Sequence, residues 1–163
     1  MSELTSSARK ALFVLKKYFV KNPEIQLSLQ IQLFNIIVAP IVNYGCEIWG
    51  SRKADPIEKF HRSFLKYVLR VKSSTPNCFV YGELGVYPLY IERYIRIMSF
   101  WVKIINCSDK ENSLLYRVYK ELCNLTISNP REVTWASRVM GIPNKCGLGN
   151  IWVAQNIYSK TEF

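Results

Sequence analysis

The side chains that most often carry enzyme chemistry are scarce in this sequence. Among 163 residues there are two aspartates, Asp55 and Asp109, and one histidine, His61. Two-metal phosphoryl transfer and Ser-His-Asp catalysis each need several such side chains close together. The composition therefore predicts that the chain is not an enzyme by itself and that it binds no cofactor. His61 lies at the edge of an apolar helix face and is interpreted as a core or boundary residue.

The five cysteines do not match a metal-binding pattern. They are at least 16 residues apart, no C-x-x-C occurs, and no pair of histidines accompanies them. A zinc site is therefore not expected. Isolated cysteines in an apolar chain are typical of a reducing compartment, which predicts an intracellular location in the nucleus or the cytoplasm.

No targeting or membrane-spanning segment is recognised in the sequence. Four basic residues between positions 9 and 17 interrupt the N-terminal region too often for the apolar part of a signal peptide. The longest uncharged run, residues 25–46, is long enough to cross a bilayer, but it contains several Gln, Asn and Ser residues and Pro40. Polar groups of this kind are costly in lipid, so we expect a buried helix of a protein that does not span a membrane.

Positive charge is concentrated in the first half of the chain. The net charge is +10; residues 1–72 hold 12 basic and 5 acidic residues, and the remainder holds 10 and 7. A basic half favours a polyanionic partner, either nucleic acid or an acidic surface of a membrane or protein. The alternative is a domain that is basic without binding a polyanion.

One basic stripe stands out within this half. Lys59, Arg62, Lys66 and Arg70 follow one another at intervals of three, four and four, so a helix would place them on one side. No acidic residue occurs from position 59 to position 72. Cations at successive helical turns can contact phosphates without reading bases. The alternative is a solvated helix face with no ligand, and Tyr67 is a further candidate for base stacking.

A second basic face is predicted nearer the N-terminus. Residues 4–21 have helical periodicity with one apolar side, and the opposite side carries cations. Phe13 and Val20 lie among these cations and could instead belong to the core. The candidate nucleic-acid-binding residues on this helix are Arg9, Lys10, Lys16 and Lys17.

The elements that must position these side chains are helical. The pattern predicts an irregular all-α domain of six to eight helices, with helices over residues 4–21, 56–72 and 88–106. Residues 25–41 fit a helix or a strand, and Pro40 would kink or end a helix there. The predicted helix starts are Asn22-Pro23-Glu24, a capping box from Asp55 to Glu58, Thr75-Pro76, a second capping box from Ser108 to Glu111, and Asn129-Pro130.

Glycines and a weak boundary complete the predicted organisation. Gly82 or Gly85 would end the helix after Pro76, Gly141 would end the helix after Pro130, and a short last helix would cover residues 151–158. A basic helical region over residues 1–107 would be followed by a small helical extension over residues 108–163.

Four stretches of the chain resemble one known family, in order and in spacing. Residues 40–50 are PIVNYGCEIWG, residues 57–69 are IEKFHRSFLKYVL, residues 74–76 and 81–89 are STP and YGELGVYPL, and residues 147–152 are GLGNIW, with Gln155 three residues later. These stretches resemble the region downstream of the palm in non-LTR retrotransposon reverse transcriptases. The resemblance covers the chain from about Leu4 to Gln155.

The resemblance implies a part of such an enzyme rather than the whole. The family's palm carries paired aspartates that bind metal ions, and this sequence contains no Asp-Asp pair. The chain is therefore similar to the thumb and the region after it. A polymerase thumb grips the backbone of the template–primer duplex, so the resemblance implies non-specific binding of RNA–DNA or duplex backbone, with a polymerase palm as a second partner. The alternatives are a helical structural or interaction module and a decayed remnant without activity.

Overall fold

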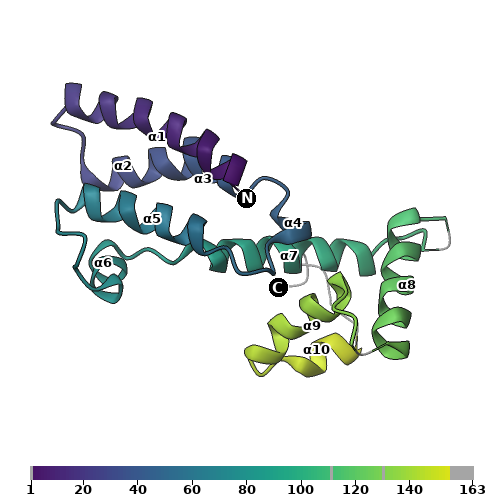
Figure 1. Ribbon diagram of the computed structural model, residues 1–163. Coiled ribbons are helices and arrows are strands. Elements are labelled where there is room, and N and C mark those ends of the chain that lie inside the picture. The colour runs from purple at the N-terminus through teal and green to yellow at the C-terminus, as the bar shows by residue number, and fades with distance from the viewer. Residues whose placement is uncertain (1, 111, 130, 155–163) are drawn as a thin grey trace. The chain divides into compact units, whose positions relative to one another are not determined.

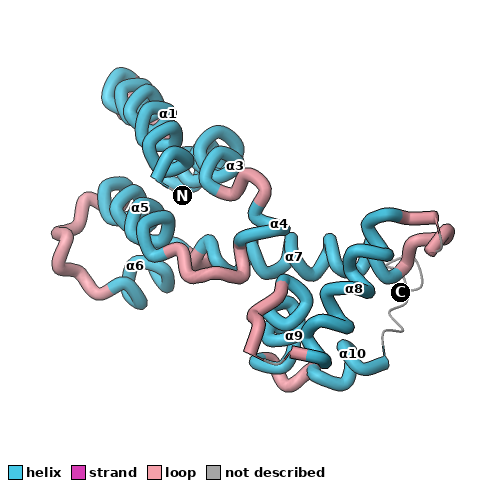
Figure 2. Tube along the Cα trace, turned by 45° about the vertical axis from the view of Figure 1, so that its right-hand side comes forward, coloured by secondary structure: helices cyan, strands magenta, loops and turns pink. Residues whose placement is uncertain are grey.

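The computed structural model describes residues 2–154 apart from 111 and 130 (Figures 1 and 2). These residues form helices joined by turns, and no β-strand occurs among them, which confirms the all-α class. The chain divides into two compact units. Unit 1 comprises Met1–Gly45 and Arg52–Arg93, and unit 2 comprises Cys46–Ser51 and Tyr94–Phe163. The division thus falls inside a helix and not after residue 107.

Helix α1 (Ser2–Lys21) follows the predicted pattern closely. Its buried side chains recur at helical spacing and include Ala8, Leu12, Leu15 and Phe19. This side packs against α3, against the π-helical segment that precedes α3 and against α5. Figure 1 shows α1 alongside α2 and α3. Phe13 and Val20, which the sequence left open as core residues, are exposed.

The segment of ambiguous pattern after α1 is helical throughout. Helix α2 (Leu27–Leu33), a π-helical turn η1 (Phe34–Val38) and helix α3 (Ala39–Val42) follow one another without a break. Pro40 explains the π turn, because its ring would collide with a carbonyl of a regular α-helix and it has no N–H to donate. In the wider turn the Ala39 N–H donates to the Phe34 carbonyl, five residues earlier.

The predicted helix start at Asn22 is wrong. The backbone N–H of Asn22 and its side-chain Nδ2 both donate to the Tyr18 carbonyl, at 3.1 and 2.8 Å. Asn22 therefore satisfies the C-terminal end of α1, where carbonyls lack intrahelical partners. Helix α2 starts four residues after Pro23, at Leu27.

Helix α5 (Asp55–Val68) differs from its prediction at both ends. Its N-cap is Ala54, whose side chain has no acceptor, so the predicted N-cap Asp55 is instead the first residue of the helix. Glu58, the last residue of the predicted capping box, turns into the interior of unit 1 and pairs there with Arg93 (Oε1 to Nη2, 2.6 Å). The helix ends at Val68, before the predicted limit of residue 72. Arg70 follows in the left-handed region with φ 55°, and the Val71 N–H returns to the Lys66 carbonyl at 3.1 Å. This pair of features is a Schellman ending of the helix.

The core of unit 1 is built around Phe34. Its ring is fully buried and stacks on Phe64 at a centroid distance of 4.2 Å and on His61 at 5.3 Å. Helix α6 (Asn77–Leu84) adds Val80 to the buried side chains of this unit. It ends at Gly85 with φ 60°, which confirms one of the two predicted glycine stops.

Unit 2 contains α4 (Cys46–Trp49), the larger part of α7 (Leu89–Ile105), α8 (Leu114–Ser128), α9 (Trp135–Lys145) and α10 (Gly149–Ala154). Helix α7 confirms the prediction for residues 88–106. Helices α8 and α9 begin later than predicted, because Ser113 and Thr134 act as their N-caps. The hydroxyl of Ser113 accepts from the Tyr116 N–H, and the hydroxyl of Thr134 accepts from the Ser137 N–H.

The C-terminal boundaries also differ from their predictions. Helix α9 continues through Gly141 and Pro143 to Lys145, so Gly141 does not end it. The predicted capping box from Ser108 to Glu111 and the predicted start at Asn129-Pro130 each include one residue outside the described part of the chain. Residues 155–158 of the predicted last helix also lie outside it.

The core of unit 2 is rich in tryptophan and tyrosine. Trp101 is fully buried, stacks on Trp152 at 4.9 Å and donates its Nε1–H to the Tyr119 hydroxyl at 3.1 Å. Trp135 meets Tyr119 edge to face and donates to the Glu47 carbonyl at 2.9 Å, which ties α4 into this unit. None of the described helices combines the length and the apolarity that a membrane crossing requires.

Candidate nucleic-acid interface

Helix α5 presents three of the four stripe cations away from its buried side. Ile57, Phe60 and Phe64 fix that side against the core of unit 1, and the charged residues lie on the remaining circumference. Lys59 is exposed, and Arg62 and Lys66 are half-buried. The predicted stripe is therefore present over the length of the helix.

The fourth stripe residue, Arg70, does not lie on the helix as predicted. The chain has already left α5 at Leu69, and Arg70 is exposed in the left-handed turn beyond it. A left-handed conformation costs a residue with a Cβ about 1 kcal/mol relative to glycine. Arg70 therefore has a strained backbone conformation. Its positive charge is stabilised in part by the dipole of α5, because it lies near the C-terminal end of that helix.

Lys66, in the last turn of α5, contacts the loop that follows the helix. The Nζ of Lys66 donates to the Ser73 carbonyl at 2.6 Å, which anchors the loop after the helix. Lys66 is therefore both a positive charge in the last turn of α5 and a contact that positions the loop after it. A substitution of Lys66 must be checked for its effect on folding as well as on binding.

Arg62 lies at the boundary between the stripe and the interior. Burial is the first cause that raises the pKa of Tyr81 and the charge of Glu58 is the second, whereas Arg62 acts in the opposite direction. The Arg62 guanidinium is thus close enough to α6 to act on its tyrosine. We expect Arg62 to contribute less to a ligand than the exposed Lys59.

The four candidates on α1 divide between two sides of that helix. Lys16 leans onto α5, where its Nζ lies 4.0 Å from the centre of the Tyr67 ring, and burial lowers its pKa. Arg9 lies two turns earlier on the same side, because seven residues separate it from Lys16. Lys10 and Lys17 are exposed on the other side of α1. In the sequence they lie four residues before and three residues after Val14.

The contact between Lys16 and Tyr67 joins the two basic helices. Lys59, Ser63 and Tyr67 follow at intervals of four along α5, and all three are exposed. This row leads from the stripe to the Lys16 ammonium. Sequence reasoning missed the pairing because 51 positions separate the two residues. Since Lys16 covers one face of the Tyr67 ring, a base could stack there only by displacing it.

His61 lies in the core, which confirms its interpretation as a core or boundary residue. It is 3% exposed, and its Nδ1 has no hydrogen-bond partner among the described residues. Burial lowers the pKa of His61 to about 4, and the charges of Arg62 and Arg93 act in the same direction. The imidazole is therefore neutral at pH 7 and packs as an aromatic ring.

The two aspartates occupy helix and turn positions. Asp55 is exposed in the first turn of α5. The carboxylate of Asp109 accepts from the backbone N–H and the side-chain Nδ2 of Asn112, at 3.2 and 3.0 Å, so it closes a turn before α8. Within the described ranges, no three His, Cys, Asp or Glu side chains lie close enough together to hold a metal ion.

Comparison with protein-family models, with curated proteins and with solved structures finds no match to this chain. The functional assignment therefore depends on the arrangement of the side chains themselves. Lys16, Lys59, Lys66 and Arg70 form a cationic surface across α1 and α5, which we call the α1/α5 surface.

Proposed function

We propose that this chain binds the sugar-phosphate backbone of nucleic acid without sequence specificity, through the α1/α5 surface. The observation that carries the proposal is the row of cations along a helix whose segment, residues 59–72, contains no acidic residue. Exposed charges of one sign gain from a polyanion by releasing its condensed counterions. A helix face that only had to be soluble would be more stable with both signs of charge, because opposite charges three or four residues apart form favourable pairs.

The proposed ligand is an RNA–DNA hybrid or another duplex. The motif resemblance to the thumb and post-thumb region of a retrotransposon reverse transcriptase supports this choice, because a thumb holds duplex backbone. We propose no catalytic role for the chain, since its two aspartates serve a helix start and a turn. A nuclear or cytoplasmic location is part of the same proposal.

A binding comparison between the two units tests this function. The test variant is Lys59→Gln with Lys66→Gln and Arg70→Asn; Asn is chosen because it tolerates the left-handed turn. The matched control removes three exposed cations of unit 2, with Arg117→Gln, Lys120→Gln and Lys145→Gln. Both variants lose the same charge, so a difference between them reports the location of the contact.

Fluorescence anisotropy with an RNA–DNA hybrid, duplex DNA and a single strand gives the readout. We expect the unit 1 variant to lose at least about tenfold in affinity at 0.1 M salt, for every sequence of a given ligand type. The unit 2 control should stay within about threefold of the parent chain. Circular dichroism on the same samples excludes misfolding. If both variants bind as the parent does, or if the parent binds none of the ligands, the proposed function is wrong.

A further inference from the structure

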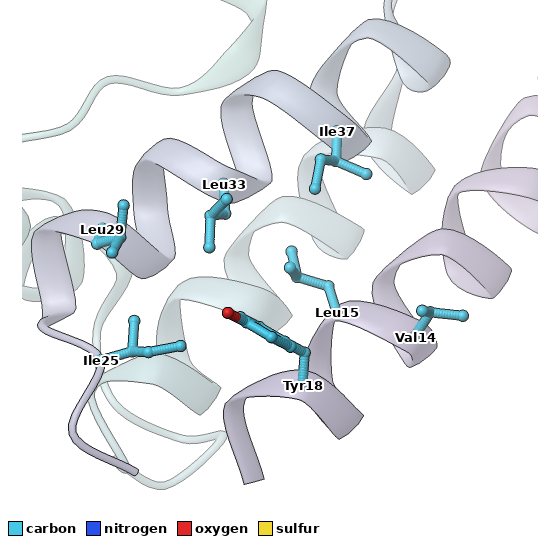
Figure 3. A pocket seen from close by; sticks show the side chains of 7 residues that line it. All are labelled: Val14, Leu15, Tyr18, Ile25, Leu29, Leu33 and Ile37. Carbon is cyan, nitrogen blue, oxygen red and sulfur yellow. The ribbon is translucent and has the colours of Figure 1, made fainter. Parts of the chain in front are cut away.

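An apolar groove runs between α1 and the segment that follows it in unit 1 (Figure 3). Its volume is about 470 Å³. Figure 3 shows Leu29, Leu33 and Ile37 on one helix, facing Leu15 and Tyr18 on the other. The full lining consists of Val14, Leu15, Tyr18, Ile25, Leu29, Leu33 and Ile37.

The helix on the far side of the groove lacks a complete partner. Helix α2 carries three leucines and an isoleucine in seven residues, yet none of them is fully buried. Leu29 and Ile37 remain 44% and 43% exposed, and Val14 across the groove is 66% exposed. A seven-residue helix gains little stability from its own hydrogen bonds and depends on packing of its apolar side. The groove is therefore a surface suited to an additional packing element.

The chemistry of the lining favours a helix over a small molecule. Six of the seven lining side chains are aliphatic, and Tyr18 contributes one hydroxyl. A small-molecule site normally combines apolar walls with several polar groups that fix the ligand's orientation. A long apolar groove between two helices instead matches the apolar side of an amphipathic helix, with anchors at i, i+4 and i+7.

Charge next to the groove identifies the partner further. Lys10, Lys17 and Lys21 are exposed on α1, three or four residues from the lining residues Val14 and Tyr18. The opposite wall consists of Ile25, Leu29, Leu33 and Ile37, and no charged residue occurs from position 25 to position 46. The exposed Glu24 adjoins this wall only at its end, before Ile25. One edge of the groove is thus cationic and the other neutral, which is complementary to a helix with acidic residues along one edge.

A second copy of this chain fits the groove poorly. The exposed apolar residues of α1 are interspersed with the same lysines, so a copy would bring cations against cations. The net charge of +10 adds to this repulsion.

We propose that the groove between α1 and α2 binds an amphipathic helix of another protein, with apolar anchors on one side and acidic residues along the edge that meets α1. This interaction is separate from the α1/α5 surface, because Lys10 and Lys17 lie on the other side of α1 from Lys16. A chain that holds both ligands would link nucleic acid to a protein partner.

A pair of designed helical peptides tests the proposal. Both have 20 residues and leucines at i, i+4, i+7 and i+11; the acidic peptide has Glu along one edge of the apolar face, and the basic peptide has Lys there. We expect the acidic peptide to bind with a Kd below about 100 µM and the basic peptide at least tenfold more weakly. Val14→Gln combined with Leu29→Gln should weaken the acidic peptide at least tenfold, whereas Val20→Gln on another side of α1 should not.

Four further measurements complete the test. Lys10→Glu with Lys17→Glu and Lys21→Glu should reverse the preference between the peptides, and the α1/α5 variant described above should leave peptide binding unchanged. If the Val14→Gln and Leu29→Gln substitutions leave the Kd of the acidic peptide unchanged, the proposal is wrong. So would sedimentation showing a dimer that those substitutions dissociate, which would assign the groove to a second copy. Groove-dependent binding to vesicles of anionic lipid, without binding of the acidic peptide, would assign it to a membrane surface.

Discussion

The two units differ in how they use charge, inside and outside. Unit 1 contains 13 basic and six acidic residues, and unit 2 contains nine and six. Unit 1 also buries an ion pair, Glu58–Arg93, and a neutral histidine, whereas the core of unit 2 satisfies its polar atoms with neutral bonds such as Trp101 to Tyr119. The difference teaches that the cationic surface belongs to one folded unit and is not a general property of the chain.

The difference in the cores predicts a difference in sensitivity. A buried ion pair and a buried neutral histidine respond to pH and to loss of one partner more strongly than neutral hydrogen bonds do. Unit 1 should therefore be the fragile unit and unit 2 the robust one.

Removing the central ring of unit 1 should have the largest effect. Phe34→Ala leaves a cavity against Phe64 and His61, and the free energy of unfolding should fall by about 3–5 kcal/mol. Amide hydrogen exchange should show the loss in unit 1, with protection around Trp101 retained. Equal loss of protection in both units would contradict the separation of the two cores.

Breaking the buried ion pair should have the next largest effect. Glu58→Leu leaves the Arg93 guanidinium without its carboxylate, and urea denaturation should show a loss of about 3 kcal/mol. The double variant Glu58→Leu with Arg93→Met should recover most of this loss, because no charge then remains buried. A double variant as unstable as the single one would show that the pair contributes more than its charges.

The pH dependence of unit 1 should follow His61. Because burial lowers the pKa of folded His61 to about 4, the unfolded chain binds more protons between pH 6.5 and 4. Keeping His61 neutral costs no stability above pH 6.5. As the pH falls from 6.5 to 4, the free energy of unfolding should decrease by up to about 3 kcal/mol because of this residue. His61→Phe keeps the stack on Phe34 and should flatten the dependence. An unchanged dependence in denaturation curves at pH 7, 5.5 and 4.5 would show that His61 does not cause it.

The neutral core of unit 2 should show the smallest of these effects. Tyr119→Phe removes the hydroxyl that accepts from the Trp101 indole and leaves that N–H unsatisfied, at a cost of about 1–2 kcal/mol. The loss should not depend on pH between 4.5 and 7. A loss as large as that of Glu58→Leu would remove the contrast between ionic and neutral cores.

Local sequence patterns predicted elements better than boundaries. The buried side of α1, the extent of α7 and the stop at Gly85 depend on periodicity or on backbone conformation within a few residues. Helix starts were harder, because several cap-forming residues lie near each start and packing selects one of them. Thr134, five residues after the predicted Asn129, caps α9, and its hydroxyl also shares a hydrogen bond with Thr126 of α8 at 2.6 Å.

The candidate surface was predictable in composition but not in arrangement. The intervals between Lys59, Arg62 and Lys66 were sufficient to place these residues on one side of a helix. The ending of α5 before Arg70 could not be predicted, since no glycine or proline marks it. The α1 cations lie on two sides of the helix, and Lys16 covers the Tyr67 ring. Both features depend on which helices pack against α1. That information lies in long-range contacts.

The most direct test of the central claim is the salt dependence of binding to duplex DNA. The slope of log K against log salt counts phosphate contacts, at about 0.9 per contact. We expect Lys59→Gln with Lys66→Gln and Arg70→Asn to flatten this slope by about 2–3 units, and the matched unit 2 variant, Arg117→Gln with Lys120→Gln and Lys145→Gln, to leave it unchanged. A slope that is the same in the parent and the unit 1 variant, or that flattens equally in both variants, would contradict phosphate binding by the α1/α5 surface.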